Sequence, residues 1–280
     1  MTGAATLLLG AALTGAAPDA ETTRLLTLGA AVTETVAALG FEEAIVGVDT
    51  TSRFPETLSD RPRVGYLRTL SAEGLISLRP TRVIGSEAAG PAAAIEALRS
   101  AGLDVQLVPE ARDWPEAKAR MLAIGRALDR EAEAKKMVGA VDQRLSDLAQ
   151  RLDGRTRPKV LFLFAHGRAP VVAGKGTTAD TMIALAGAVN ALPGITGYEP
   201  PSAEAVVAAE PDVILTAPSV LERMGGTDGV LELPGLRATP AAQAGRIVVM
   251  DAVLLLGMGP RTATAAERLA SKLHPTLASR

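Results

Sequence analysis

The central stretch from Asp113 to about Leu152 constrains the fold most strongly, because it carries no strand pattern and separates two halves that do. Asp113 is a good N-cap, Pro115 suits a first helical turn, and Gly154 ends the pattern. The apolar residues recur three or four positions apart, at Ala134, Met137, Val138, Val141, Leu145, Leu148 and Leu152. A helix of ~38 residues would be ~57 Å long, which exceeds the diameter of a small domain. We therefore predict one long interlobe helix over residues 113–153.

Strand and helix patterns alternate on both sides of this segment. Apolar strand patterns cover residues 24–29, 44–49, 82–86 and 104–109 in the first half, and residues 159–165, 212–218 and 246–251 in the second. Such alternation is typical of a parallel sheet with helices on both faces. The predicted fold class is therefore α/β, with an N-terminal α/β lobe over 21–112 and a C-terminal α/β lobe over 154–280, each built on a parallel sheet.

The composition excludes several classes of protein. The 280 residues carry a formal net charge of −2 with no long run of one sign, which argues against a nucleic-acid-binding protein. No cysteine is present, so disulfides and thiolate metal sites are excluded. Aromatic residues make up only 2% of the chain, so the core must consist of Leu, Val, Ile and Ala. We expect a monomer.

The first twenty residues resemble a secretory leader. The run "ATLLLGAALTGAA" is apolar or small throughout and is too short for a membrane span, which needs ~20 residues. Small residues at Ala16 and Ala17 suit signal cleavage, although no Lys or Arg precedes the run. We predict a signal-like leader over residues 1–20; the alternative is a buried N-terminal helix.

One phrase occurs twice in the chain. "GYLRTLSAEGLISLRPTRVI" begins at Gly65 and "GYEPPSAEAVVAAEPDVIL" begins at Gly197, and Glu73 and Glu204 in these phrases differ by 131 in number. Ser at an N-cap and Glu in the first turn both stabilise the start of a helix, and this local preference by itself explains each copy. The same phrase in matching places of two lobes indicates two equivalent surface points.

The chain resembles the substrate-binding proteins of ABC importers for haem, cobalamin and siderophores. The resemblance rests on both phrases and on the order of lobe, helix and lobe. It implies two α/β lobes with the ligand cleft between them and a periplasmic location. It also implies that Glu73 and Glu204 dock into arginines of the ABC permease, whose ATPase supplies the energy. We infer separately that a single interlobe helix permits only small hinge motion, because one stiff element resists wide opening.

The phrase "VGYLRTLSAEGLISLRP" resembles the haem-binding branch of that family in particular. In that branch the matching tyrosine is an axial ligand of haem iron, which implies that Tyr66 holds the iron of haem b carried as cargo. Ferric iron is a hard Lewis acid that suits a phenolate oxygen. The resemblance also covers "VAGKGTTADTMIALAGAVNA" and "GYEPPSAEA" in the second lobe. Arg68 is positioned to stabilise the phenolate or to pair with a haem propionate.

Three residues of the second half are further candidates. His166 follows an apolar strand, where ligands bind in parallel sheets, and some haem-binding relatives place a histidine opposite the tyrosine. His166 is therefore the second candidate iron ligand. Tyr198 and Met258 are candidates for haem contact, although both are also explained by packing. We interpret the remaining cations near the expected cleft as mostly solvated, namely Arg53, Arg168, Lys175 and Arg261.

Two rival functions stay open. An unrecognised two-lobed metal-binding enzyme is one, but the chain has only two histidines and none of the common hydrolase or metalloprotease motifs. The same fold carrying cobalamin or a ferric siderophore is the other, and it would not need Tyr66 as a metal ligand. We expect a protein that is not an enzyme.

Overall fold

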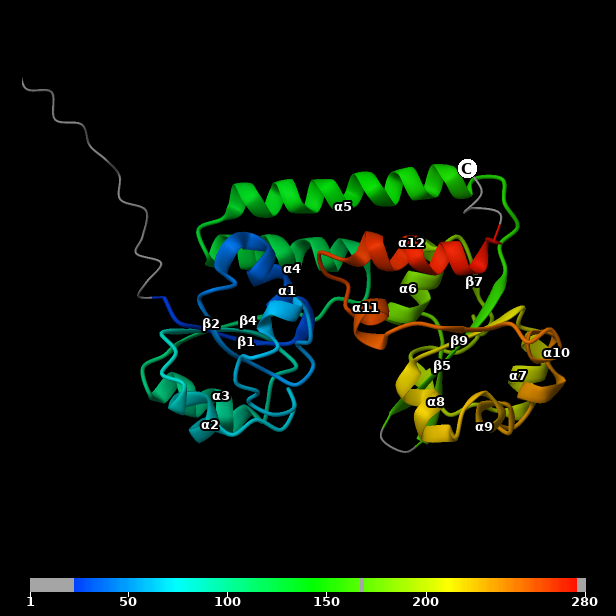
Figure 1. Cartoon of the computed structure of the whole chain (residues 1–280), viewed down its shortest axis with the longest axis horizontal. Helices are drawn as coiled ribbons and strands as arrows, with labels where there is room; N and C mark the ends of the chain where they lie inside the picture. The colour runs from blue at the N-terminus through cyan, green and yellow to red at the C-terminus, as the bar shows by residue number, and fades with distance from the viewer. Residues whose placement is uncertain (1–22, 167–168, 276–280) are drawn as a thin grey trace, which may run out of the picture.

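The computed structural model describes residues 23–166 and 169–275, which form two lobes joined by a pair of long helices (Figure 1). The predicted leader over residues 1–20 lies outside these residues. Each lobe has its own sheet with helices packed around it. In Figure 1 the N-terminal lobe is drawn in blue and cyan, and the C-terminal lobe in green to red.

The N-terminal lobe contains a four-stranded, wholly parallel sheet in the order β2-β1-β3-β4, which confirms the prediction for this half. All four residues of its central strand β1 are buried, as expected for a strand covered on both faces. The lobe consists of β1 (Leu25–Leu28), α1 (Ala30–Val36), η1 (Ala37–Phe41), β2 (Ile45–Val48), η2 (Glu56–Leu58), α2 (Ala72–Ser77), β3 (Arg82–Ser86), α3 (Ala92–Ser100) and β4 (Asp104–Val108).

The sheet of the C-terminal lobe is mixed rather than parallel, so the prediction was wrong on this point. Strands β10, β9, β5 and β7 are parallel, but β6 and β8 add an antiparallel extension along β5. The strands are β5 (Lys159–His166), β6 (Ala169–Ala173), β7 (Val189–Asn190), β8 (Tyr198–Glu199), β9 (Val213–Thr216) and β10 (Ile247–Val249). A Gly-Arg pair between two apolar runs is a sequence pattern typical of a two-residue hairpin connection between antiparallel strands.

The helices of the C-terminal lobe cover both faces of this mixed sheet. They are α6 (Thr178–Leu185), α7 (Ala203–Ala209), α8 (Pro218–Met224), α9 (Thr227–Leu231), η3 (Leu236–Ala238), α10 (Pro240–Gln243), α11 (Ala252–Leu256) and α12 (Thr262–Leu273).

The interlobe segment contains two helices, which corrects the prediction of a single one. Helix α4 (Trp114–Ala127) ends at a tight turn in which Asp129 has a φ of 55°, and α5 (Glu131–Leu152) then runs back along α4 (Figure 1). Asp is one of the few residues that tolerate this left-handed conformation, so no Gly or Pro marked the break. The 22 residues of α5 make it about 33 Å long.

The helical hairpin of α4 and α5 contributes buried side chains to a hydrophobic core in each lobe. The first half of α4 and the second half of α5 pack into the core of the C-terminal lobe, through Trp114, Ala117, Met121, Val141, Leu145 and Leu148. The residues around the turn pack into the core of the N-terminal lobe instead, through Ile124, Leu128 and Ala134. Two packed helices therefore connect the lobes, and each helix is anchored in both cores.

Candidate functional site

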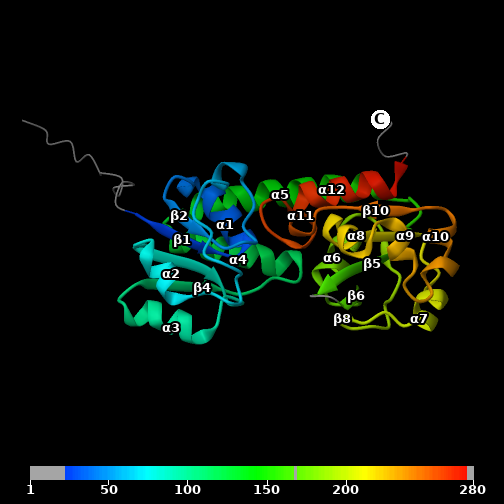
Figure 2. The ribbon, with the colours of Figure 1, turned by 60° about the horizontal axis from the view of Figure 1, so that its bottom comes forward.

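The parallel strands of the two lobes point at one another. Figure 2 shows β1 and β5 with their carboxyl ends directed toward the opposite lobe. Loops that follow the carboxyl ends of parallel strands form the ligand sites of open α/β sheets. The two sets of loops therefore face each other across the interlobe space.

A cavity of about 810 Å³ lies between the loops that follow β3 and β4 in the N-terminal lobe and the segments next to β6 and β8 in the C-terminal lobe. The N-terminal lobe contributes acidic side chains to its wall, among them Glu87 and Glu110, while the C-terminal lobe contributes Lys175 and Tyr198. The volume lies within the range of ~300–1,000 Å³ that is usual for small-molecule sites. The two lobes therefore enclose a space of ligand size, whose C-terminal wall lies beside the antiparallel strands β6 and β8.

Tyr66 lies in the loop that follows β2, with its side chain 46% exposed. The backbone amide of Val64 donates to the carbonyl of Val48, and that of Thr50 donates to the carbonyl of Gly65 at 2.9 Å. Gly65 has a φ of 99°, a conformation that a side chain would strain. The phrase Gly-Tyr thus has a local reason: the glycine makes the bend that presents the tyrosine.

The residues after Tyr66 alternate between the core and the surface. Leu67 and Leu70 are buried and are tied by backbone hydrogen bonds to Gly90, whereas Arg68 points outward. Arg68 forms an ion pair with Glu110 at 3.7 Å, with both side chains about half exposed. The Arg68 guanidinium therefore lies beside a carboxylate of the interlobe cavity wall.

Two predicted residues of the C-terminal lobe lie at its cleft-facing edge. Tyr198 lies in β8, is 42% exposed and places its hydroxyl 3.5 Å from Thr178 Oγ1 in the cavity wall. His166 is the last residue of β5 and pairs with Ala169 in the antiparallel ladder. The side chain of His166 lies outside what the structure describes, as does Arg168.

The two glutamates of the repeated phrase lie on helices at matching places. Glu73 is in the first turn of α2 and Glu204 in the first turn of α7, and both are exposed. Ser71 and Ser202 occupy the two N-cap positions as predicted, but only Ser202 forms a side-chain hydrogen bond to the helix. In Figure 1 both helices lie on the opposite side of the molecule from α5.

Met258 is placed differently from the prediction. Its side chain is 1% exposed and packs in the core shared by α4, α5 and α12, so its sulfur does not face an open cleft. Its backbone carbonyl accepts a hydrogen bond from Arg120 Nη2 at 2.6 Å. Met258, which has a φ of 47° in the connection between α11 and α12, is therefore a core residue.

Four residues join the lobes in a way that the sequence interpretation missed. Glu34 on α1 is 6% exposed and accepts two hydrogen bonds from the Arg261 guanidinium, of which the one from Nε is 2.8 Å long. The Cζ of Arg261 lies 3.9 Å from the ring centroid of Phe54. Arg120 on α4 donates to the carbonyls of Gly257 and Met258. We call Glu34, Phe54, Arg120 and Arg261 the interlobe latch.

The latch corrects the interpretation of Arg261 as a solvated cation. Glu34 is the one charged residue in the helix sequence "AAVTETV", and a carboxylate among small and β-branched residues is a signal for a buried partner. Burial lowers the pKa of the Arg120 guanidinium, while the carboxylates of Glu110, Glu116 and Glu34 act in the opposite direction. Arg261 is thus the hydrogen-bonded cation of the buried Glu34 carboxylate, whereas Arg120 binds backbone carbonyls.

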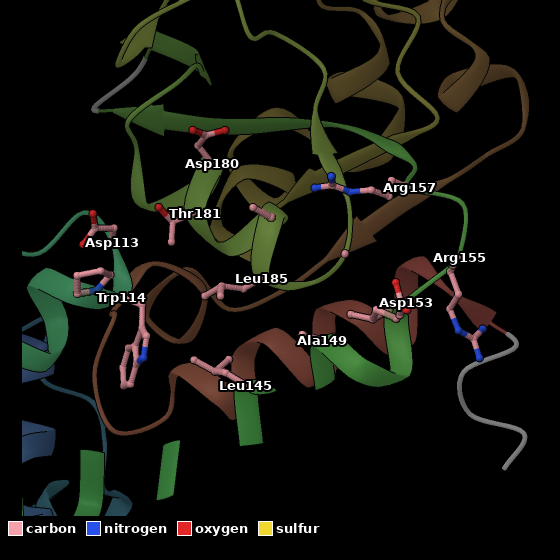
Figure 3. A pocket seen from close by; sticks show the side chains of 15 residues that line it. Asp113, Trp114, Leu145, Ala149, Asp153, Arg155, Arg157, Asp180, Thr181 and Leu185 are labelled. Atoms are coloured by element: carbon pink, nitrogen blue, oxygen red, sulfur yellow. The ribbon is translucent and has the colours of Figure 1, made fainter. Parts of the chain in front are cut away.

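A second cavity, of about 610 Å³, lies between the start of α4, the second half of α5 and helix α6 (Figure 3). Leu145 of α5 and Leu185 of α6 line facing walls, and Trp114 closes one side (Figure 3). Trp114 Nε1 donates to Asp142 Oδ1 at 2.6 Å, so the indole is held in place. None of the predicted site residues lies in this cavity.

Two further observations concern the described ranges 23–166 and 169–275. No group of three or more His, Cys, Asp or Glu side chains there is arranged to hold a metal ion. No helix in those ranges is both long enough and apolar enough to cross a membrane.

Comparison with known proteins gives a consistent family assignment. Residues 25–254 match the family described as periplasmic binding protein. The periplasmic heme-binding protein RhuT of Roseiflexus sp. RS-1 is 38% identical with a TM-score of 0.85, covering 91% of this chain and 99% of RhuT. The periplasmic heme-binding protein HutB of Vibrio cholerae is 40% identical with a TM-score of 0.82, covering 90% and 99%. A cobalamin-binding protein of Halobacterium salinarum is 26% identical over 92% of this chain and 71% of its own length.

Proposed function

We propose that this chain, which belongs to the periplasmic binding protein family, captures ferric haem between its lobes and delivers it to an ABC-type permease of the inner membrane. The observation that carries the proposal is its 38–40% identity, over nine-tenths of the chain, to two periplasmic heme-binding proteins. The exposed Tyr66, two residues before Arg68 and its ion pair with Glu110 of the cavity wall, supports it independently. The chain itself catalyses no reaction in this proposal, since the ATPase of the importer supplies the energy.

Tyr66 is the proposed iron ligand from the N-terminal lobe. Tyrosinate is an established axial ligand of ferric haem, because a hard anionic oxygen suits a hard cation. The positive charge of the iron favours the phenolate over the phenol. The exposed position of Tyr66 leaves its oxygen free to bind, and the bend at Gly65 sets its direction.

Arg68 and Tyr198 are proposed to contact the rest of the haem. Arg68 already pairs with a carboxylate, Glu110, at 3.7 Å, and a haem propionate would present the same chemical group. Tyr198 offers an exposed ring from the opposite lobe for contact with the macrocycle. His166 is proposed as the ligand on the other face of the iron, since β5 ends there toward the N-terminal lobe (Figure 2).

Glu73 and Glu204 are proposed to dock the loaded protein onto the permease. Across the described part of the chain neither carboxylate forms an ion pair, and both are exposed on helices of different lobes. Arginines are the natural partners of exposed carboxylates, because the guanidinium binds them through two parallel hydrogen bonds. The two carboxylates therefore remain available for a basic partner.

An absorption titration of the apoprotein with hemin tests the cargo and the ligand together. Tyr66→Phe keeps the ring and removes only the oxygen, and Tyr198→Phe is the matched control because these are the two tyrosines of the chain. We expect saturable binding with a phenolate-to-iron charge-transfer band that is lost in Tyr66→Phe and kept in Tyr198→Phe. The number of equivalents at saturation distinguishes one bound haem from two.

Cobalamin is the alternative cargo, because a cobalamin-binding relative matches most of the chain. The titration is therefore repeated with cobalamin. Saturable binding of cobalamin without a specific hemin spectrum would replace the haem assignment. A hemin spectrum that is unchanged in Tyr66→Phe would keep haem as the cargo and remove Tyr66 as its ligand.

A further inference from the structure

Five large apolar or aromatic side chains of the described residues are exposed, and two of them belong to no site discussed so far. Phe54 packs on Arg261 in the latch, Tyr66 is the proposed iron ligand, and Tyr198 lines the interlobe cavity. The remaining two are Ile76, which is 39% exposed, and Val207, which is 42% exposed. A single exposed aliphatic residue needs no explanation, but these two occupy related positions.

Ile76 and Val207 lie at equivalent places in the two lobes. Their numbers differ by 131, as do those of the two docking glutamates, and each lies three residues after its glutamate. The residue before each one is fully buried, namely Leu75 in α2 and Val206 in α7. The two short helices therefore bury one apolar residue and expose the next in the same register.

The end of each helix repeats as well. Arg79 and Glu210 also differ by 131 in number, and both have a positive φ, of 49° and 46°. A buried proline follows each of them. The two segments therefore share their backbone course, although one lobe has a parallel sheet of four strands and the other a mixed sheet of six.

Each helix consequently presents a carboxylate and a branched aliphatic group side by side. Residues three apart on a helix are surface neighbours, with Cβ atoms ~5–6 Å from each other. We call the pairs Glu73–Ile76 and Glu204–Val207 the two acid–aliphatic patches. An occupant of such a patch needs a cation next to an apolar pocket.

We propose that Ile76 and Val207 are the apolar anchors of the permease-docking surface, each inserted beside the arginine that pairs with the neighbouring glutamate. This inference rests on the proposed function. The same patch on two otherwise different lobes points to a partner that presents one surface twice, which is a permease of two identical subunits. The negative charge of both patches complements a basic partner.

The two members of each patch have different physical roles. An exposed rim charge mainly accelerates encounter and makes binding sensitive to salt. A desolvated apolar anchor mainly slows dissociation. We therefore expect the glutamates to govern the association rate and Ile76 and Val207 to govern the lifetime of the complex.

The test measures binding of the haem-loaded protein to the permease–ATPase complex of its importer, reconstituted in lipid nanodiscs. The variants are Ile76→Ser, Val207→Ser and the double variant. The matched controls are Ser77→Ala and Ala208→Ser, which are the next exposed residues of the same two helices and again differ by 131 in number. A hemin titration of every variant reports on folding and cargo binding.

Each single variant should weaken binding by about tenfold, which is about 1.4 kcal/mol, chiefly through faster dissociation. The affinity of the double variant should be about a hundredfold lower than that of the wild type, because the two patches are distant and independent. The controls should bind like the wild type, and hemin titrations should be unchanged throughout.

Several outcomes would overturn the inference. If the double variant binds the nanodiscs as tightly as the wild type while Glu73→Gln and Glu204→Gln do not, the anchors are refuted and the proposed function stands. If only one of the two single variants weakens binding to the nanodiscs, a partner with two identical docking surfaces is refuted. A wild-type dimer in sedimentation that the double variant dissociates would make a second copy the occupant. Failure of the wild type to bind hemin or nanodiscs would instead refute the proposed function.

Discussion

The interlobe latch makes a quantitative prediction, because its two charged partners differ in burial. The side chain of Glu34 is 6% exposed, whereas that of Arg261 is 25% exposed. Arg261→Gln leaves a buried carboxylate without its cation, and breaking a buried ion pair in this way costs ~3–5 kcal/mol. Glu34→Gln leaves a cation that still reaches water and still stacks on Phe54. This second change loses charge-assisted hydrogen bonds, which are worth ~1.5–3 kcal/mol.

The two substitutions should therefore destabilise the protein to different extents. Arg261→Gln should lower the free energy of unfolding more than Glu34→Gln does, and its melting temperature should fall by roughly 10 °C. The double variant should be more stable than Arg261→Gln alone, because the unpaired carboxylate has been removed. Arg53→Gln is the matched control, since Arg53 is an exposed arginine in the same loop as Phe54.

Urea unfolding followed by tryptophan fluorescence measures these changes. The chain has one tryptophan, and Trp114 is buried where α4 packs into the core of the C-terminal lobe, so its emission reports on the hairpin. The reasoning fails if Arg261→Gln and Glu34→Gln agree within about 0.5 kcal/mol, the usual error of additivity. It also fails if the double variant is no more stable than Arg261→Gln.

Three other predictions concern the loop and the helical hairpin. Gly65→Ala should weaken hemin binding in the titration and lower the free energy of unfolding in urea by about 1 kcal/mol or more, because φ is 99° there. Unchanged hemin binding would show that the conformation of Gly65 does not position Tyr66. Gly125→Ala should cost ~1–3 kcal/mol in the same unfolding assay, since an added Cβ would lie 2.4 Å from Ala134 Cβ, and a neutral result would show that the turn can relax. The hydrogen bond from Lys135 lowers the pKa of Glu131, so this pair adds stability above the unfolded-state pKa and loses it as the pH falls through the folded-state pKa. The stability difference between wild type and Glu131→Gln should accordingly shrink in acid, and a difference that grows in acid would reverse the assigned sign.

The sequence alone determined the features that depend on local pattern. Alternating apolar runs located β1, β2, β3 and β4 within one or two residues, because buried strands and amphipathic helices each impose their own period. The repeated phrase placed Glu73 and Glu204 on equivalent helices, since N-cap and first-turn preferences are local. The phrase around Tyr66 predicted haem through its resemblance to the haem-binding branch of the family, which a contiguous stretch of sequence can carry.

Only the tertiary structure decided the features made by residues far apart in the sequence. The break at Asp129 is stabilised by packing of α4 on α5. The spacing of apolar residues does not reveal this break, because the same spacing continues through both helices. Met258 became a core residue because α11 and α12 meet α4 there. Glu34 and Arg261 are 227 positions apart, so no local pattern could pair them. Charge and hydrophobicity indicate which side chains need partners, but the fold alone determines which partners they meet.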